Sequence, residues 1–434
     1  MARSSKKHIV IPSAKRLMAS LRDTGYDFSQ AIADIVDNSI EARASQVNID
    51  IEFQGDDSWV RIADNGHGMS AKTIREAMRY GSDSEYDDDS LGKFGLGLKT
   101  ASLSQCRRLT VASRKSLSSP AAFCWDLDHV AKTDLWEILP IEPGKLVKAI
   151  IEPLLTGRGT VVFWQRLDRI LGYKLPYGDA AKQRLSSMCA ELEAHLAMVF
   201  HRFLSGDVPR RKFTIILNGN IIKPWDPYCR DEPGTKLLHK MRFPVDVDGA
   251  SVGEVIVKPY ILPTETDFSS PDAFRRASGP AKWNQQQGLY IYRSNRMIQC
   301  GGWAKLRAAD EHTKYARVAV DYTKELDDYF KINFPKTRGQ LPSQIREELR
   351  EQMSKVAKLA RKVYDKKTDS SIPISAPIVS IGSASSNIQK NISHNTSSSS
   401  MAPTYNVKQW AEKMRSVSRP AELPVVNNIL LRLI

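Results

Sequence analysis

The stretch AIADIVDNSIEARA, Ala31–Ala44, places three carboxylates and an amide within one short apolar pattern. Drawn as a helix, it forms an apolar stripe at the spacing of a buried face. That stripe consists of Phe28, Ala31, Ile32, Ile35, Val36 and Ile40. On the other side Asp34, Asn38 and Glu41 follow at i, i+4 and i+7, so their side chains point the same way. This polar face lies either in water or against a ligand, and other parts of the chain must decide which.

The composition narrows the class of protein. A chain of 434 residues, 41% of them hydrophobic, is too long for one compact core, so we expect two folded domains with appendages. No apolar run reaches about eighteen residues, and the basic start MARSSKKHIVIPSAKR lacks the apolar core of a leader. We expect a cytoplasmic protein with no membrane partner. The five cysteines are scattered without a CxxC pair, which fits neither a disulfide framework nor a zinc cluster.

The net charge of +14 is unevenly distributed. Residues 1–170 contain 23 Lys plus Arg and 23 Asp plus Glu, so they are neutral. The remainder holds 40 basic and 26 acidic residues, out of totals of 63 and 49, and therefore carries the whole excess. A basic second half is compatible with neutralising nucleic-acid phosphates, so DNA is an expected partner there. Many basic proteins bind no nucleic acid, and that alternative stays open.

The apolar patterning predicts an α+β fold. Two alternating stretches between Val47 and Asp64 flank a polar turn, as in a β-hairpin. Further strands are predicted in RRLTVASRK, AAFCWDLD and GTVVFWQRL, with helices at 71–80 and 98–103. A mixture of hairpins and helices is typical of a fold in which helices cover one face of a mostly antiparallel sheet.

The rest of the chain predicts a second unit and an appendage. A connector helix over 179–203 leads into RKFTIILNGNIIKPW, where Asn218-Gly219 is a strong hairpin turn, and a charged helix over 342–364 ends the unit. A Ser-rich, nearly uncharged stretch then predicts a disordered linker. The expected boundaries are 1–172, 173–367, 368–403 for the linker and 404–434 for a tail. The tail ends in VVNNILLRLI, an apolar sequence expected to pack against the protein or bind an effector protein.

Two motifs offer polar side chains for hydrogen bonding to a ligand. DNGHGM, Asp64–Met69, follows a predicted strand, and its carboxylate can accept a hydrogen bond from an exocyclic amine. Gly66 and Gly68 allow a close approach that a side chain would block. In GRGTVVFW, Thr160 enters a strand with its hydroxyl available. Taken alone, DNG is a common hairpin turn.

A third motif, GKFGLGLKTAS, suits phosphates. It places Gly92, Gly95 and Gly97 ahead of a helix, where free backbone N–H groups can hold an anion. The acidic run Asp83–Asp89 precedes it and is expected to be solvated. A single glycine-rich loop is weak evidence by itself.

In this order and spacing the four pieces resemble the GHKL nucleotide-binding fold of gyrase-type topoisomerases, MutL repair proteins, heat-shock chaperones and sensor histidine kinases. The resemblance covers about residues 10–170 and implies a Bergerat-type α/β sandwich ATPase domain that binds ATP and Mg²⁺. It implies that Asn38 is the magnesium ligand, through its side-chain oxygen, and that Asp64 binds adenine. The further binding residues that it implies are Gly66, Gly68, Met69 and Thr160 near the base, and Gly92, Lys93, Phe94, Gly95, Leu96, Gly97, Leu98 and Lys99 in the phosphate-facing lid.

One position departs from the family pattern. Asp34 sits where hydrolytic members generally carry a Glu that orients the attacking water. Because Asp is one methylene shorter, this residue reaches its proton only if the helix is shifted, or else it works slowly. Asp37 and Glu41 are adjacent alternatives, of which Asp37 is expected to form a structural pair and Glu41 can be solvated.

A closer resemblance is to Microrchidia-type ATPases and their prokaryotic relatives. It rests on AMRYGS, GKFGLGLKTAS, LNGNIIKPWDPY and GLYIYRSNRMIQCGGW, and it extends to about residue 360. In such proteins a transducer-like α/β domain follows, with a loop lysine that inserts towards the γ-phosphate. The matching stretch FKINFPKTRGQLP makes Lys336 the candidate, with Lys331 or Arg338 as the fallback. The role of Asn295 and Arg296, after the strand GLYIYR, stays open.

The resemblance implies an ATP hydrolase that dimerises on ATP as a clamp, with DNA held by the basic half. A histidine kinase fits less well, because little chain precedes the nucleotide motifs to hold a phospho-accepting hairpin. A chaperone-like ATPase would be expected to carry larger client domains. The main alternative is a binding protein that switches on ATP occupancy with little turnover, and Asp34 in place of Glu is the feature that supports it.

Overall fold

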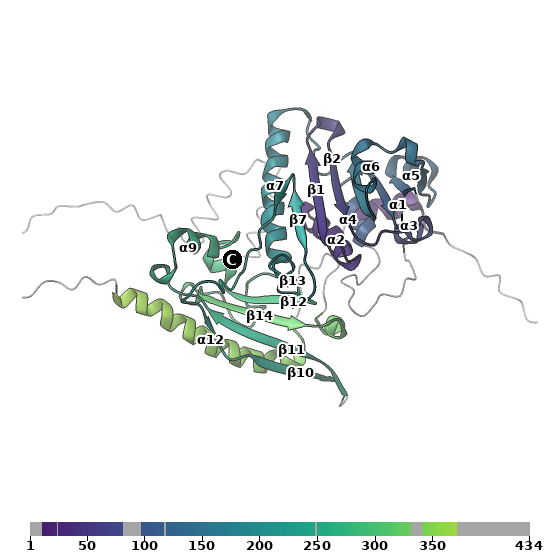
Figure 1. Cartoon of the computed structure of the whole chain (residues 1–434). Helices are drawn as coiled ribbons and strands as arrows, with labels where there is room; N and C mark the ends of the chain where they lie inside the picture. Colours follow the sequence, from purple (N-terminus) through teal and green to yellow (C-terminus); the bar gives the residue numbers. More distant parts are fainter. Residues whose placement is uncertain are drawn as a thin grey trace, which may run out of the picture. The chain divides into compact units, whose positions relative to one another are not determined.

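A computed structural model describes residues 11–23, 25–80, 97–116, 119–247, 250–330 and 341–370 (Figure 1). By its contacts the chain divides into two units, Met1–Pro373 and Ile374–Ile434. The second unit, with nearly all of the expected linker and the whole expected tail, lies outside the described residues. Within the described ranges no helix has the length and apolar character that a membrane span requires.

An eight-stranded sheet forms the first layer, in the order β5-β4-β3-β6-β2-β1-β7-β8. β1 and β2 are antiparallel with Val47 opposite Asp64, which confirms the predicted hairpin. Every neighbouring pair in this sheet is antiparallel except β1 with β7, so the prediction of a mostly antiparallel sheet is confirmed. The strands are β1 (Gln46–Glu52), β2 (Trp59–Asp64), β3 (Arg108–Arg114), β4 (Ala121–Asp126), β5 (Leu139–Ile141), β6 (Gly159–Gln165), β7 (Thr214–Leu217) and β8 (Asn220–Ile221).

The hairpin β7–β8 belongs to this sheet, whereas the sequence pattern suggested that it opens the second domain. Its turn is Asn218-Gly219 as predicted, with both residues at positive φ. The Asn218 side-chain oxygen also accepts a hydrogen bond of 2.8 Å from the Ile51 amide in β1. The physical reason for the difference is the long α7 (Asp179–Val199), after which the chain returns to pair β7 with β1. The sheet therefore extends about fifty residues beyond the expected boundary at 172.

Helices cover the face of the sheet that holds the larger core. The predicted stripe of the 31–44 stretch is confirmed, because all six of its members are buried in α2 (Phe28–Glu41). An Asp27–Gln30 capping box starts this helix three residues before Ala31. The expected single helix over 179–203 is interrupted at Phe200. The other helices of this layer are α1 (Ala14–Arg22), α3 (Ala71–Met78), α4 (Gly97–Leu103), α5 (Leu127–Thr133) and α8 (His201–Leu204), while α6 (Lys148–Ile151) packs on part of the opposite face.

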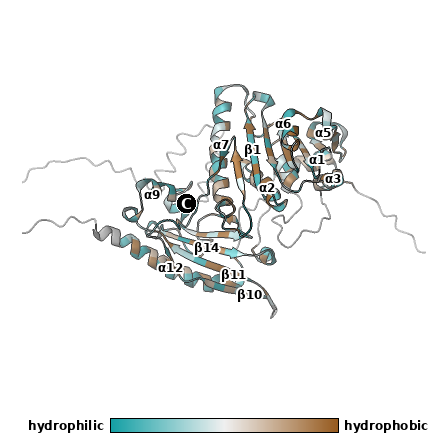
Figure 2. Cartoon of the chain, in the orientation of Figure 1, coloured by the Kyte–Doolittle hydropathy of each residue, from teal (hydrophilic) through white to brown (hydrophobic). Residues whose placement is uncertain are grey.

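A second sheet follows, in the order β10-β11-β14-β12-β13, with the short β9 beside β11. One face packs on α12, which carries hydrophobic and hydrophilic residues along its length (Figure 2). The other face is lined with tyrosines, of which Tyr292 hydrogen-bonds His201 of α8 at 2.7 Å. The last helix runs to Ser370, past its expected end at 364. The elements are β9 (Lys236–Leu237), β10 (Met241–Val247), β11 (Ala250–Ile261), β12 (Gly288–Arg293), β13 (Arg296–Gln299), β14 (Ala316–Tyr322), α9 (Pro271–Ala277), α10 (Lys282–Gln286), α11 (Asp327–Phe330) and α12 (Ser343–Ser370).

Candidate functional site

The acidic face of α2 is mostly buried. Asp34 is 3% exposed and Asp37 is 1% exposed, while Asn38 and Glu41 are half-buried. Of the predicted polar face, Asp34 is therefore withdrawn from water, while Asn38 and Glu41 stay partly exposed. Buried carboxylates require charged or hydrogen-bonding partners, because an unpaired ion in a protein interior is strongly unfavourable.

Those partners form a cluster of Tyr26, Asp34, Asp37 and Arg296, which we call the ion cluster. The Tyr26 hydroxyl donates to Asp34 Oδ2 at 2.5 Å. Arg296 Nε donates to both carboxylate oxygens of Asp37, at 3.2 and 3.0 Å, and a terminal guanidinium nitrogen lies 3.7 Å from Asp34 Oδ1. Burial, reinforced by the Asp34 carboxylate, raises the pKa of Tyr26 well above its usual value, so Tyr26 is a neutral donor.

Arg296 brings the second sheet into contact with the helix of the opening stretch. It begins β13 directly after Ser294 and Asn295, both at positive φ, and its side chain is 4% exposed. The pairing expected for Asp37 is therefore confirmed. His195 of α7 lies beside the cluster, and burial together with the nearby Arg296 charge lowers its pKa to about 4. At neutral pH His195 thus adds no charge to the cluster.

Asp64 ends β2 with its carboxylate turned back on its own loop. Oδ1 accepts a 2.8 Å hydrogen bond from the Gly66 amide, and Oδ2 accepts one of 3.3 Å from the hydroxyl of Ser39 on α2. Burial raises the pKa of Asp64 to about 6, although these hydrogen bonds oppose the shift. The Ser39 bond joins the DNGHGM loop to the residue that follows Asn38.

The loop residues and Thr160 lie together, as their expected roles require. A Cβ at Gly66 would lie 2.7 Å from the Ala42 carbonyl oxygen, and one at Gly68, where φ is +66°, would lie 2.1 Å from the Arg114 carbonyl oxygen. Both positions therefore exclude a side chain. Ser113 connects the remaining members, since its hydroxyl oxygen accepts from the Met69 amide at 2.7 Å and lies 2.9 Å from the Thr160 hydroxyl. Thr160 is also directly opposite Asp64 in the β2–β6 register.

Part of the lid motif is described. Gly97 and Leu98 open α4, which packs on α2, and a Cβ at Gly97 would lie 3.4 Å from Asp34 Oδ2. The Lys99 ammonium donates to the carbonyls of Ala77 and Arg79 at the end of α3, at 2.9 and 2.8 Å. Burial lowers the pKa of Lys99 to about 8. The other expected members lie outside the described residues, namely Gly92, Lys93, Phe94, Gly95, Leu96, Lys336 with its alternatives Lys331 and Arg338, and the acidic run Asp83–Asp89.

Four contributors were not predicted from the sequence, namely Tyr26, Ser39, Ser113 and Arg296. The serines are short polar residues within apolar patterns, a common core feature. Tyr26 precedes the helix cap and reads as a boundary residue. Arg296 offered one usable signal, because an arginine that opens a buried strand requires a carboxylate partner.

Comparisons with known proteins agree with this geometry. Residues 26–153 match the family described as histidine kinase-, DNA gyrase B-, and HSP90-like ATPase. The DNA mismatch repair protein MutL of Mannheimia succiniciproducens is 27% identical over 202 residues, which are 45% of this chain and 28% of that protein. MutL of Shewanella sediminis is 37% identical over 91 residues, 20% of this chain and 14% of that protein. The chain thus spans less than a third of the length of these relatives.

A solved structure, the N terminal domain of a DNA repair protein, aligns with a TM-score of 0.47 at 14% identity and covers 82% of this chain and 98% of that chain. The family match contains α2, the DNGHGM loop and α4, whereas Thr160 and Arg296 lie outside it. Residues 26–153, which lie within an α+β fold, are therefore similar to the ATPase domain that this family model describes.

Proposed function

We propose that the protein binds ATP with Mg²⁺ at the site between α2 and the DNGHGM loop and hydrolyses it slowly. The observation that carries this proposal is the Ser39–Asp64 hydrogen bond, which ties the expected adenine carboxylate to the helix of Asp34 and Asn38. The proposed base-binding residue Asp64 and the proposed reacting residues of α2 are therefore held in one hydrogen-bonded framework. Rigid placement of this kind is what positioning catalysis requires.

The loop geometry supports the base-binding part of the proposed site. Asp64 accepts a hydrogen bond from the exocyclic amine of adenine, while Gly66 and Gly68 let the loop pack closely against the Ala42 and Arg114 carbonyls. Met69 and Thr160 border the same space through their shared contact with Ser113.

The phosphates and the metal are assigned to α2 and the lid. Among the described residues no group of three or more His, Cys, Asp or Glu side chains could hold a metal by itself. An Asn38 oxygen that acts together with phosphate oxygens and water suits Mg²⁺, which usually takes few protein ligands. When bound, the metal supplies neutralisation of developing phosphate charge. The glycines of the lid, from Gly92 to Gly97, and Lys336 complete the phosphate contacts in this proposal.

Asp34 orients the attacking water and accepts its proton. Its Oδ2 accepts a hydrogen bond from the Tyr26 hydroxyl, and its Oδ1 lies near a guanidinium nitrogen. A carboxylate whose oxygens already face a donor and a cation must be released before it can take up a proton from water, so turnover is slow until the cluster rearranges. This occupied state is also the observation that favours the second candidate, a switch that binds ATP with little hydrolysis.

The larger cycle proposed is that of a Microrchidia-like clamp. ATP binding orders the lid, brings Lys336 to the γ-phosphate and favours a homodimer that acts on DNA, and hydrolysis reverses these steps. An effector protein at the C-terminal tail is part of the same proposal. Support comes from the basic second half and from the mismatch repair proteins among the relatives.

The decisive experiment measures ATP hydrolysis and ATP binding side by side for the intact chain, Asp34→Asn and Asn38→Ala, with and without duplex DNA. We expect Asp34→Asn to lose turnover by at least about a hundredfold while retaining ATP affinity, and Asn38→Ala to lose magnesium-dependent binding. Unchanged turnover in Asp34→Asn would remove Asp34 from its role. Binding of ATP without hydrolysis by the intact chain, even with DNA, would leave the switch.

A further inference from the structure

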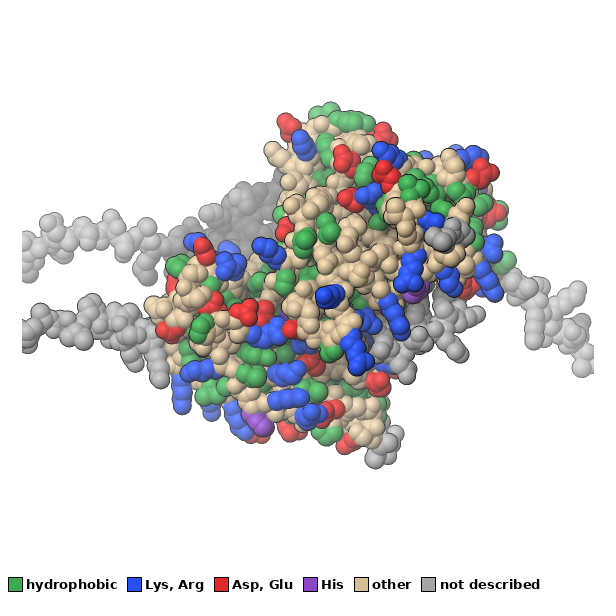
Figure 3. All heavy atoms as spheres, in the orientation of Figure 1, with side chains coloured by type: hydrophobic (Ala, Val, Ile, Leu, Met, Phe, Trp, Pro, Cys, Tyr) green, Lys and Arg blue, Asp and Glu red, His purple; other side chains and the backbone are tan. Residues whose placement is uncertain are grey.

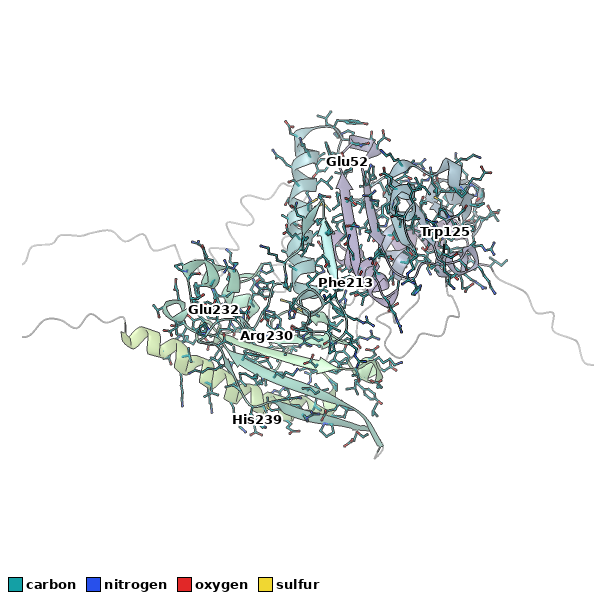
Figure 4. All side chains as sticks on the ribbon, viewed as in Figure 1. Glu52, Trp125, Phe213, Arg230, Glu232 and His239 are labelled. Carbon is teal, nitrogen blue, oxygen red and sulfur yellow. The ribbon has the colours of Figure 1, made fainter. Side chains whose placement is uncertain are left out.

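A basic hollow of about 480 Å³ opens where α2 ends and β7 begins. Its rim carries four cations, Arg43 from the turn after α2 and Arg210, Arg211 and Lys212 from the segment before β7. All four are exposed. Figure 3 shows Lys and Arg side chains distributed over the viewed face, and Figure 4 labels Phe213, which lines the hollow.

The cations of the basic hollow lack acidic partners. No Asp or Glu lines it, and within the described ranges none of the four forms an ion pair. Arg211 instead donates a 3.5 Å hydrogen bond to the Ile40 carbonyl. A larger cavity of about 650 Å³ beside α7 behaves differently. There each arginine has a carboxylate, in the pairs Arg22–Asp168, Arg169–Asp23 and Arg184–Glu191.

Helix capping does not account for so much charge. The carboxyl end of α2 presents about half a negative charge, which offsets only a fraction of four cations. Two of the four, Arg43 and Arg210, also sit at positive φ, at 55° and 59°. Such backbone is uncommon for a long side chain and persists only when the surroundings hold it in place. Among the described residues, the hollow therefore concentrates positive charge that no carboxylate in its lining offsets.

The floor of the hollow indicates what kind of anion fits. Phe203 and Phe213 are 3% and 6% exposed, so they form an apolar base and offer no ring face for a nucleobase to stack on. Binding of single strands generally uses exposed aromatic side chains. A rim of cations above an apolar floor instead suits a phosphodiester with its sugar. These groups are the same at every nucleotide, so such a contact carries no sequence information.

The hollow also connects to the nucleotide loop. Ser45, on its rim, accepts a hydrogen bond from the Asn65 side-chain amide at 2.9 Å. The Asn65 side-chain oxygen in turn accepts from the amides of Ser45 and Gln46, at 2.9 and 3.0 Å. Asn65 lies next to Asp64, so a ligand in the hollow and a nucleotide at Asp64 share one hydrogen-bonded segment.

We propose that the basic hollow binds the sugar-phosphate backbone of duplex DNA. This inference rests on the DNA role in the proposed function and names the surface that performs it. The chain contacts DNA through Arg210, Lys212, Arg43 and Arg211, independently of base sequence. Because the contacts are to phosphates, binding weakens steeply as salt rises.

The test compares the full-length double variant Arg210→Gln/Lys212→Gln with the control Lys132→Gln/Lys174→Gln. The control removes two exposed cations that form no ion pair within the described ranges and lie outside the hollow. Binding of a fluorescent 30-base-pair duplex is measured by anisotropy over a salt series, and basal ATP hydrolysis is followed in parallel. Losing two phosphate contacts lowers the salt slope by about 2 and the affinity roughly 60-fold at about 0.1 M salt. The control should keep the slope, and all variants should keep basal hydrolysis.

The outcomes separate the two proposals. If the intact chain binds DNA and the hollow variant binds it equally well, the hollow is not the DNA surface although the DNA role stands. If the intact chain hydrolyses ATP but binds no duplex, the DNA role falls and the hollow inference falls with it. Equal losses in the hollow variant and the control would reduce the effect to net charge and overturn the inference. A hollow variant that loses a poly-glutamate peptide but not the duplex would assign the site to acidic protein segments.

Discussion

Arg296 is the residue whose removal should most clearly expose how the ion cluster is held. Arg296→Gln leaves Asp37 and Asp34, 1% and 3% exposed, without the guanidinium that lies 3.0 and 3.7 Å from their oxygens. Removing one partner of a buried ion pair generally costs about 3–5 kcal/mol, because the remaining charge stays desolvated. We expect a loss of that size, measured as the shift of the urea midpoint multiplied by the slope m.

The matched control is Arg242→Gln. Arg242 of β10 pairs with Glu254, but the two side chains are 58% and 38% exposed, so the expected loss is at most about 1 kcal/mol. Adding Asp37→Asn to Arg296→Gln should restore part of the lost stability, since it removes one of the stranded charges. The reasoning is refuted if Arg296→Gln costs no more than Arg242→Gln, or if the double variant is less stable than Arg296→Gln alone.

Two further predictions concern Asp64 and Gly68 of the DNGHGM loop. Because burial raises the pKa of Asp64 from 3.8 to about 6, ATP affinity should fall as pH is lowered through about 6, where the accepting carboxylate becomes protonated. The same shift means that the folded chain holds the Asp64 proton more firmly than the unfolded chain, so this group's contribution to stability declines as pH rises from about 4 to about 6. Calorimetric ATP titrations at several pH values should show the dependence in the intact chain and not in Asp64→Asn. Gly68→Ala should destabilise the chain by about 1–3 kcal/mol and weaken ATP binding, because its Cβ would meet the Arg114 carbonyl. The control is Gly206→Ala, where the backbone has a similar φ but the Cβ would point into open space. It should leave ATP binding unchanged in the same titrations.

Local patterns predicted the β1–β2 hairpin, strands β3, β4 and β6, and helices α2, α3 and α4, because each has a short-range cause. The alternation around the turn before Asp64 and the stripe on α2 depend on residues only a few positions apart. The convergence of Asp64, Gly68 and Thr160 was also accessible, since the family pattern places those motifs in a fixed order.

Long-range packing could not be predicted from such local patterns. Asp37 and Arg296 are 259 positions apart, and nothing near either residue specifies the other. The return of β7 to β1 was missed for a related reason. A hairpin turn is a local signal, but the strand that it pairs with is chosen by where α7 delivers the chain.

That return has a consequence for how the protein is made. On a ribosome the segment up to Gln165 emerges first and can assemble most of the sheet, but β1 keeps an open edge until Thr214–Leu217 has been synthesised. An open edge presents unpaired amide and carbonyl groups that attract foreign strands. The nascent chain therefore keeps this exposed strand edge while about fifty more residues are translated. Recombinant fragments that stop near residue 172 would carry it permanently.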